Sequence, residues 1–473
     1  MGGTAHHSGR PSHDRREHPI DSPAGPEHPP AEPAWFTGEW HEEPGVLRAR
    51  RRTMRTLLIA QVAGALGVGA GPSVGVLMAA EVTSSETWAG LARASTTVGA
   101  AVFSLLLGML AARRGRRVSL TLAWSIAGAG AALLTTAPVL RSTPLLVVGM
   151  LALGAGSAAG MQSRFAATDL AAPAHRARSL ALVVWVGTLG AVLGPNLGAP
   201  GTVLETWTGL PPLSGAFALS ALLLTLTATV VALGLRPDPL QLARLHTRAA
   251  DADGDTSAGP RTSSSGTSAS AHVRMPAALR EVWRLPTGRF ALVALVLAHV
   301  AMVSVMTMTP VHLSHGGGSI TLIGLTISLH VLGMFALAPV FGAAADRFGP
   351  VPVILAGQAV LAAAALTGVL GAGSQEAVAL ALLLLGLGWS VVTVPASSLL
   401  TESVPARNRP LVQGAGDASM NAAAALGAIA SGPLMAVAGF EGLSVVAGLT
   451  VVPVLLLGRV LRRQRVPQQA RAV

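Results

Sequence analysis

Methionine and histidine recur at helical spacing in two apolar stretches of the sequence. Met302 and Met306 are four residues apart, with Met308 just beyond them, and His330 and Met334 are again four residues apart. Residues at i and i+4 share one face of a helix. Thioether and imidazole are soft, neutral ligands that suit Cu(I) better than Mg²⁺, Ca²⁺ or Mn²⁺. A soft-metal site is therefore one interpretation. Methionine is also an ordinary filler of apolar helices, so core packing or a pocket for an organic solute stays open.

The two stretches also place these side chains at similar depths. The first covers about 290–313 and the second about 320–343, running in opposite directions. At 1.5 Å per residue, Met302 lies ~17 Å from the start of its stretch and His330 ~15 Å from the start of its own. Both depths are near the middle of a hydrocarbon layer ~30 Å thick. His312, at the far end of the first stretch, is a further candidate ligand or an ordinary interfacial residue.

The composition places the whole chain in a membrane. Of its 473 residues, 51% are hydrophobic and only 12% are charged, whereas soluble domains carry roughly 25% charged residues. The net charge is +11, but the arginines fall in short clusters between apolar runs. Such clusters indicate the inner loops of a membrane protein rather than a surface for nucleic acid. The absence of cysteine excludes disulfides and thiolate ligands.

Twelve apolar runs are long enough to cross a bilayer, which takes about 20 residues. The first six cover roughly 54–80, 88–111, 118–138, 144–168, 178–200 and 213–235. The second six cover roughly 290–313, 320–343, 351–372, 377–400, 411–436 and 441–459. Because lipid offers no hydrogen bonds to the backbone, each run must be a helix. The predicted fold class is therefore an all-α integral membrane protein with twelve transmembrane helices in two six-helix halves.

Arginine placement predicts the orientation of the chain and its division into segments. Arginine clusters precede the first run and follow the second and the twelfth, and Arg141 is the exception on the opposite side. The positive-inside rule then puts both termini in the cytoplasm of a multi-pass protein of the plasma membrane. The predicted segments are a disordered tail at 1–46, a half at 47–236, a cytoplasmic linker at 237–288, a half at 289–462 and a tail at 463–473. Within the linker, 275–286 could form an amphipathic surface helix.

Two short motifs repeat between the predicted halves. The segment GMLAARRGRR at 108–117 aligns with GAAADRFGP at 342–350, an offset of 342 − 108 = 234 residues. The pair Gly194–Pro195 aligns with Gly432–Pro433, an offset of 432 − 194 = 238 residues. Two unrelated motifs that repeat at nearly one offset indicate that the second half duplicates the first.

The first of these motifs resembles the signature loop of the major facilitator superfamily, G-x-L-A-D-R-x-G-R-[RK]. The loop after the second run matches it at Arg113 but has Ala112 at the acid position, whereas the weaker second copy keeps Asp346 and Arg347. In the family the acid pairs with arginine and steadies the outward-open state, so the resemblance implies a gating role that the first half cannot fill in the same way. It also implies a secondary transporter, not an enzyme, with a midplane site between parallel repeats.

The fifth run carries a second family resemblance. Gly190, Gly194, Pro195 and Gly198 match a motif seen in many antiporters of the superfamily. Small residues let helix backbones approach closely, and proline bends a helix. The fourth run, however, has Met150 where many drug–proton antiporters carry an arginine. This difference weighs against a standard drug exporter.

Three charged residues near the ends of runs are candidates for coupling or gating. Arg164 and Asp169 are five residues apart, so on a regular helix they point roughly 140° apart and should meet different neighbours. Asp417 lies inside the eleventh run, where it either pairs with Arg407 or Arg409 or takes up a proton during transport. Ionisable groups at membrane depth are costly and usually functional.

The methionine–histidine pattern resembles the CcoA-type copper importers, a bacterial branch of the superfamily. Members carry M-x-x-x-M in span seven and H-x-x-x-M in span eight, and Met302, Met306, His330 and Met334 match both motifs. The resemblance implies copper import, with copper as cargo and with no cofactor. The implied partners are a lipid bilayer, a small solute or metal ion and possibly protons, but no nucleic acid. Two alternatives stay open: a proton-coupled antiporter that exports drugs or small organic metabolites, and a membrane sensor or scaffold that no longer transports.

Overall fold

The computed structural model describes residues 39–172, 175–254, 280, 282–404 and 409–469. Within these residues every regular element is a helix, so the predicted all-α class is confirmed. Most of the predicted tail at 1–46 and half of 275–286 lie outside the described residues. Two predicted segments differ in detail. The linker at 237–288 contains a helix, α9 (Pro239–Gly254), and α17 (Val451–Gln469) runs on into the predicted tail at 463–473.

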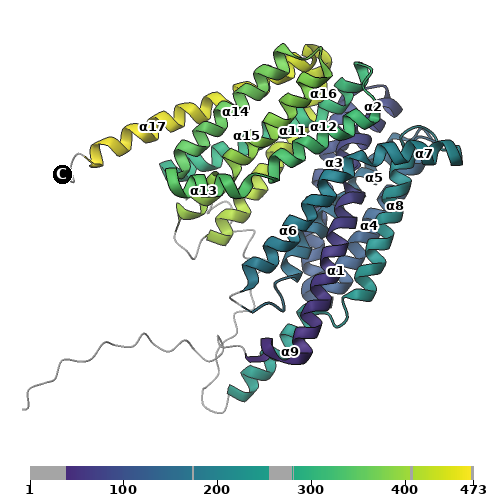
Figure 1. The fold of residues 1–473 in the computed structure, drawn as a ribbon, viewed down its shortest axis with the longest axis vertical. Coiled ribbons are helices and arrows are strands. Elements are labelled where there is room, and N and C mark those ends of the chain that lie inside the picture. Colours follow the sequence, from purple (N-terminus) through teal and green to yellow (C-terminus); the bar gives the residue numbers. More distant parts are fainter. Residues whose placement is uncertain (1–38, 173–174, 255–279, 281, 405–408, 470–473) are drawn as a thin grey trace, which may run out of the picture. The chain divides into compact units, whose positions relative to one another are not determined.

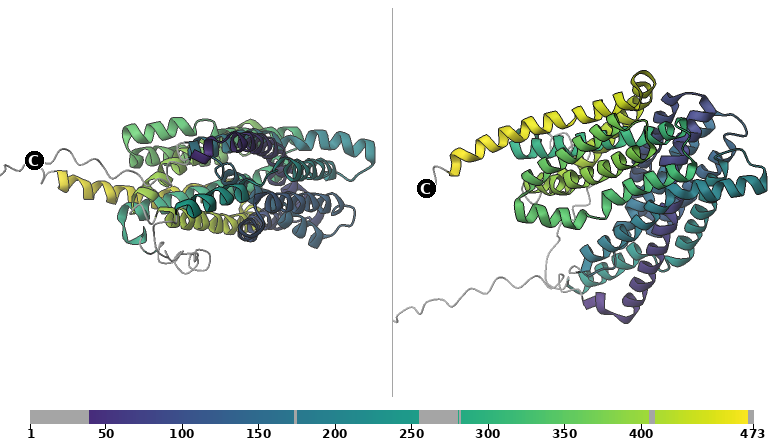
Figure 2. Two further views of the ribbon diagram at one scale, coloured as in Figure 1. Left: turned by 90° about the horizontal axis from the view of Figure 1, so that it is seen from below. Right: turned by 45° about the horizontal axis from the view of Figure 1, so that its top comes forward.

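The N-terminal half contains, in chain order, α1 (Pro44–Val68), η3 (Gly71–Gly75), α2 (Val76–Thr83), α3 (Glu86–Arg114), α4 (Arg116–Thr136), α5 (Thr143–Ala166), α6 (Arg176–Leu193), η5 (Gly194–Leu197), α7 (Gly198–Thr208) and α8 (Ser214–Gly234). The C-terminal half contains α11 (Pro286–His315), α12 (Ile320–Phe335), α13 (Ala338–Phe348), α14 (Pro350–Leu370), α15 (Gln375–Glu402), α16 (Arg409–Leu449) and α17. The purple-to-teal helices and the green-to-yellow helices form two groups in Figure 1, and the turned views in Figure 2 keep that grouping.

Eleven helical stretches among the described residues are long and apolar enough to cross a membrane. The last of them, Val412–Leu461, has 50 residues and would be ~75 Å long as one helix, more than twice the ~30 Å that a crossing needs. Its backbone breaks at Gly439, which has φ 67°, a conformation that glycine adopts without steric cost. This stretch therefore holds the two predicted spans at 411–436 and 441–459.

Three of the predicted spans are interrupted near a proline. Pro72 lies in the π-helical turn η3, Pro195 lies in the 3-10 turn η5, and Pro339 follows the break between α12 and α13. Proline lacks the N–H that would continue the helical hydrogen bonds, and its ring clashes with the preceding turn. The turn η3 is mostly buried, and Pro195 of η5 is buried too, which is where a membrane protein tolerates irregular backbone. The break before α13 is exposed at Ala336 and Leu337.

Each half has its own buried core. In the N-terminal half this core surrounds Trp124 and Phe217, and in the C-terminal half it surrounds Phe290 and Phe440. The second core also includes apolar side chains of α2 and the first turns of α3, which belong to the N-terminal half. The two halves therefore share buried surface where α3 begins. We call this the Glu86 end, and we call the opposite end of α3, with Arg113 and Arg114, the arginine-rich end.

Glycines bring the backbones of the two halves into contact at the Glu86 end. A Cβ atom on Gly90 of α3 would lie 2.2 Å from the carbonyl oxygen of Ala428 in α16, and one on Gly432 would lie 2.4 Å from that of Glu86. Between η5 and α12, which belong to different halves, Asn196 donates a hydrogen bond of 2.7 Å to the hydroxyl of Ser328. The hydrogen bonds and the ion pair that join described residues of the two halves lie at this end.

The motif of the fifth span packs α6 and η5 against α1. A Cβ on Gly194 would lie 2.6 Å from the Cα of Gly69, and one on Gly190 would lie 2.3 Å from the carbonyl oxygen of Val62. Gly198 instead faces Ile320 of the C-terminal half, and Pro195 is buried in η5. No side chain larger than hydrogen fits at Gly194 without moving a helix backbone.

Gly194→Val should therefore destabilise the protein. Overpacking a site walled by backbone costs about 1–3 kcal/mol or more, so we expect a lower midpoint of thermal unfolding for the purified protein in detergent. The matched control is Gly45→Val, because a Cβ on Gly45 meets no atom within 4 Å. Equal midpoints for the two variants would contradict the close approach of α1 and η5.

Candidate functional site

A cavity of about 520 Å³ lies between the two halves. It is lined from α1, α3, α4, α5 and α6 on one side and from α11, α12 and α16 on the other. The cavity is not enclosed, and its lining extends toward the arginine-rich end as far as Arg164. Because backbone contacts close the Glu86 end, the cavity communicates with the arginine-rich end.

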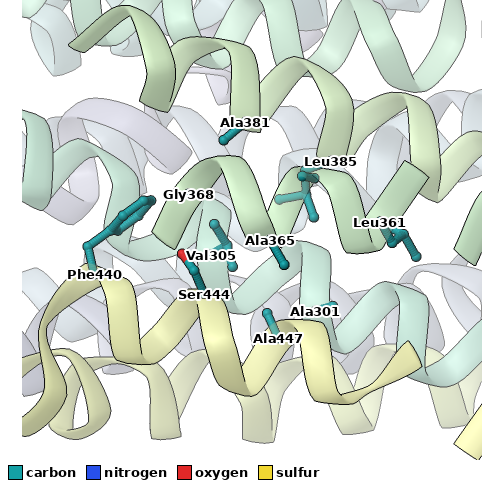
Figure 3. A pocket seen from close by; sticks show the side chains of 11 residues that line it. Ala301, Val305, Leu361, Ala365, Gly368, Ala381, Leu385, Phe440, Ser444 and Ala447 are labelled. Carbon is teal, nitrogen blue, oxygen red and sulfur yellow. The ribbon is translucent and has the colours of Figure 1, made fainter. Parts of the chain in front are cut away.

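A second, far smaller cavity lies inside the C-terminal half (Figure 3). It has a volume of about 10 Å³ and is lined mainly by apolar side chains, with Phe440 and the hydroxyl of Ser444 on one wall. A space of that size holds at most about one water. Two clefts of comparable volume, about 510 Å³ and 580 Å³, lie beside α1 and α6 and at the Glu86 end. The cavity of about 520 Å³ is lined by eight helices of the two halves at membrane depth and is therefore the candidate site.

The structure separates the four residues of the predicted metal cluster. Met302, Met306 and Met334 line the cavity between the halves, whereas His330 is fully buried and is not among the lining residues. One ring nitrogen of His330, Nδ1, lies 2.8 Å from the carbonyl oxygen of Leu382 in α15. A carbonyl can only accept, so Nδ1 carries the proton and Nε2 has the lone pair. Nε2 is buried with no hydrogen-bond partner among the described residues.

The two remaining candidate ligands lie away from the cavity. Met308 is completely buried in the core of the C-terminal half. His312 has its Nε2 2.8 Å from the carbonyl oxygen of Ala372, and its ring stacks on Phe440 with a centroid distance of 4.3 Å. Both residues therefore sit where they support the packing of α11 rather than beside the three thioethers.

The cavity also contains a charge that the sequence argument overlooked. Arg93 of α3 lines it and makes no hydrogen bond or ion pair through its side chain to any described residue. At 1.5 Å per residue, Arg93 lies ~10 Å from the start of α3 at Glu86, well inside a layer ~30 Å thick. The signal was present in the sequence as a lone arginine within the apolar run 88–111.

His299 reaches the cavity from the opposite half. The indole Nε1–H of Trp389 donates a hydrogen bond of 3.0 Å to His299 Nδ1. An indole nitrogen can only donate, so Nδ1 must accept, and the neutral ring carries its proton on Nε2. The positive charge of Arg93 acts on His299 and on His330. Arg93 and His299 line the same cavity from opposite halves.

The candidate coupling residues fall into two groups. Asp169 accepts a hydrogen bond of 2.9 Å from Nε of Arg116 at the arginine-rich end, just outside the spans. Burial raises the pKa of the Asp169 carboxyl, and the hydrogen bond from Arg116 opposes that rise. Arg164 lines the cavity, so it and Asp169 have different neighbours, as their spacing predicts.

Asp417 is not among the residues that line the cavity, but its charge acts on Arg164, which is. Asp417 is exposed, and the two opposite charges act on one another without forming an ion pair. The predicted partner Arg407 lies outside the described residues, as does the side chain of Arg409. Arg164 belongs to α5 of the N-terminal half and Asp417 to α16 of the C-terminal half, so this attraction acts between the two halves.

The two copies of the loop motif differ in structure. In the second copy, Asp346 and Arg347 are exposed, and the guanidinium of Arg347 lies 5.3 Å from the ring centroid of Phe348. In the first copy, Arg113 is exposed and Ala112 offers no carboxylate. The acid there comes instead from the chain after α8. Asp238 Oδ2 accepts a hydrogen bond of 2.7 Å from the backbone N–H of Arg117.

Asp238 also fixes the helix that follows it. Its Oδ1 accepts hydrogen bonds of 3.0 Å and 3.1 Å from the backbone N–H groups of Leu240 and Gln241, in the first turn of α9. Arg244 of α9 donates a hydrogen bond of 2.8 Å to the carbonyl oxygen of Ala112. The helix α9 is therefore attached to the loop between α3 and α4 at the position where the motif lacks its acid.

Replacing Asp238 should loosen this attachment. Asp238→Ala removes the acceptor for three backbone N–H groups, and the loss of a capping side chain costs about 0.5–2 kcal/mol. We expect faster proteolytic cleavage in the segment between α8 and α11 and a slightly lower unfolding midpoint. Asp238→Asn keeps one carbonyl oxygen as an acceptor, so its cleavage rate and unfolding midpoint should lie between those of the wild type and of Asp238→Ala. Cleavage of Asp238→Ala at the wild-type rate would show that these hydrogen bonds do not hold α9.

The family model and the relatives that match this chain identify the same family. The chain matches the family model described as Major Facilitator Superfamily over residues 56–319 and 313–473. It is 32% identical to the uncharacterized MFS-type transporter YddS of Bacillus subtilis over 429 residues, which cover 90% of this chain and 95% of that protein. It is also 27% identical to the riboflavin transporter RfnT of Brucella anthropi over 415 residues, which cover 86% of this chain and 96% of that protein.

Solved structures with low sequence identity share the fold. The nucleoside transporter NupG is similar with a TM-score of 0.58 and 14% identity, over 87% of this chain and 99% of that one. The human organic anion transporter MFSD10 is similar with a TM-score of 0.56 and 19% identity, over 88% of this chain and 100% of that one. At such identities the likeness concerns the arrangement of the helices and carries no information about cargo.

Proposed function

Because this chain belongs to the Major Facilitator Superfamily and is thus a membrane transporter, we propose that it carries a small organic solute through the cavity between its halves by alternating access. The observation that carries this proposal is the cavity itself. It draws on helices of both halves, it is closed at the Glu86 end, and it opens toward the arginine-rich end. Such a cavity exposes its contents to one side of a membrane at a time.

The size and lining of the cavity support an organic cargo. Its volume of about 520 Å³ lies within the range of roughly 300–1,000 Å³ that small-molecule sites occupy. Apolar and aromatic walls, including Trp124 and Phe335, alternate with amide side chains such as Gln61 and Asn421. The name of the relative RfnT indicates a vitamin as its cargo, and we propose a solute of similar size here.

The charges at the arginine-rich end suggest how the cavity closes on the other side. The positive-inside rule would place this end in the cytoplasm, which makes the described conformation inward-facing. For the outward-facing conformation the two halves must meet at this end. Arg164 and Asp417 carry opposite charges on opposite halves, and we propose that they pair when the cavity closes there. Protonation of Asp417 would weaken that pair and could couple transport to protons.

Closure at the Glu86 end gives a direct test of alternating access. Gly90→Leu places a side chain against the backbone of Ala428, where a Cβ alone would approach to 2.2 Å, so the halves can no longer meet at that end. We expect counterflow of labelled solutes, riboflavin among them, to fall by about tenfold or more in proteoliposomes, because a carrier that cannot close at the Glu86 end cannot complete its conformational cycle. The matched control Gly373→Leu changes a glycine with open space around it.

A cysteine reporter shows which conformation each variant adopts. The chain has no cysteine of its own, so Ser157→Cys places a single thiol on the cavity wall. In the wild-type background a membrane-impermeant maleimide should label it from the arginine-rich side. In the Gly90→Leu background labelling should appear from the Glu86 side. Wild-type transport by Gly90→Leu would overturn the proposed cycle.

Copper import is a second candidate because three thioethers converge on one cavity. Met302, Met306 and Met334 line it, and His330 is held through Nδ1 with a free lone pair on Nε2, as metal-binding histidines usually are. Two observations weigh against this cargo. His330 is not among the lining residues, and the unpaired guanidinium of Arg93 in the same cavity would repel a cation.

Replacing the thioethers separates the two cargoes. The triple variant Met302→Leu, Met306→Leu, Met334→Leu nearly conserves volume and removes the sulfur ligands. We expect transport of the organic solute to stay within about threefold of wild type, since only apolar contact is exchanged. We also expect cells that express the wild-type chain to accumulate no more radioactive copper than cells with an empty vector. Copper uptake by the wild type that the triple variant loses would instead establish copper as the cargo.

A further inference from the structure

Arg93 is a charged residue at membrane depth without a protein counter-charge. Its side chain faces the cavity and forms no ion pair or hydrogen bond with a described residue. Among the described residues that line the cavity there is no aspartate or glutamate, whereas two of them, Arg93 and Arg164, are arginines. Ionisable residues inside membrane spans are costly and normally have a partner. Since the described residues supply no partner, we look for one in a bound solute.

The neighbourhood of Arg93 supplies further hydrogen-bond donors, and no described lining residue is a carboxylate that would compete with an anionic ligand for them. His299 lines the same cavity and is held by Trp389 in the tautomer that bears its proton on Nε2. A ring that must accept at Nδ1 stays neutral and offers one N–H donor. Asn421 of α16 lines the cavity as well and adds an amide. A guanidinium with neutral N–H donors around it is a suitable environment for a carboxylate or a phosphate.

The position of these groups links binding to the transport cycle. Arg93 lies on α3 of the N-terminal half, whereas His299 lies on α11 and Asn421 on α16 of the C-terminal half. An anion held by Arg93 and His299 together would bridge the seam between the halves. It would also offset the positive charge of Arg93 when the cavity is sealed from water, the step at which an unpaired charge is most costly.

We propose that Arg93 and His299 form the binding site for an anionic group, a carboxylate or a phosphate, on the transported solute. The inference rests on the proposed function and adds the chemical class of the cargo. Arg93 contributes charge and paired N–H donors, and His299 contributes one neutral donor from the other half. The remainder of the solute occupies the apolar part of the cavity beside the three methionines.

Pairs of compounds that differ only in charge test this site. The probes are nicotinate with nicotinamide, indole-3-acetate with indole-3-acetamide, and flavin mononucleotide with riboflavin, so that both carboxylates and a phosphate are compared with neutral counterparts. Binding to the purified full-length protein in detergent is measured by thermal shift and by quenching of tryptophan fluorescence. We expect at least one anionic member to bind and its neutral counterpart to bind more weakly. A consistent preference for carboxylate or for phosphate would identify the group.

Variants of the two residues assign the preference to the site. Arg93→Gln should weaken binding of the anionic member by about tenfold or more, the loss expected for a charge-assisted hydrogen bond, and leave the neutral member unchanged. Arg93→Lys should recover part of the affinity. His299→Leu should weaken binding of the anionic member, whereas His299→Gln keeps an N–H donor and should weaken that binding less. Arg141→Gln, in the exposed turn between α4 and α5, is the control.

The ligand-free stability of Arg93→Gln distinguishes a binding role from a structural one. An arginine that awaits an anion is uncompensated in the empty protein, so its removal should leave the unfolding midpoint unchanged or raise it. A clearly lower midpoint would indicate a structural partner and would count against the site. An anion preference that survives Arg93→Gln, or a wild type that prefers no anion in any pair, would overturn the inference.

The proposed function fails on a different result. Transport of a neutral solute in proteoliposomes that does not depend on Arg93 would leave the organic-solute transporter in place and remove only the anion site. A wild-type protein that transports no member of the panel and binds none would contradict both.

Discussion

Backbone contact between the two halves at the Glu86 end is the constraint on which the rest of the structure depends. The halves meet there through glycines, at Gly90 with Ala428 and at Gly432 with Glu86. Because no side chain separates these backbones, the halves are in direct contact here, and the cavity of about 520 Å³ extends toward the other end. A separate cleft of about 580 Å³ lies outside this contact, at the Glu86 end itself. Contacts between glycine and backbone bury little apolar area, so they can be made and released as the protein changes conformation, in contrast to the two buried cores that hold each half together.

Charge inside the cavity is the second constraint. The part of its lining that the structure describes has two guanidinium groups and no carboxylate, and the low dielectric of the surroundings makes that imbalance matter more than it would at a surface. The thioethers of α11 and α12 are neutral and adapt their shape easily. In such a cavity they are better suited to packing against the apolar part of an organic solute than to holding a cation next to Arg93.

At the arginine-rich end, the first copy of the loop motif shows how a lost residue can be replaced from elsewhere in the chain. Ala112 offers no carboxylate, but Asp238 binds the backbone of Arg117 and caps α9 at the same time. The linker between the halves is thus attached to the loop between α3 and α4, while Asp169 pairs with Arg116 beside it. These interactions tie the ends of α3, α4, α5 and α8 together at the arginine-rich end, within one half.

The membrane class and the approximate positions of the spans could be predicted from the sequence, because runs of about 20 apolar residues must be helices in lipid. The Gly-Pro pairs near 194 and 432 predict that the second half duplicates the first. Three of the four proposed metal ligands could also be placed at one site by depth and spacing alone. Only the tertiary structure decided which faces of those helices look inward. Spacing fixes the angle between two side chains on a helix but not the rotation of that helix against its neighbours. His330 therefore turns to α15, Arg93 turns to the cavity, and Asp238 reaches a loop 121 residues away in sequence, because packing between helices sets these directions.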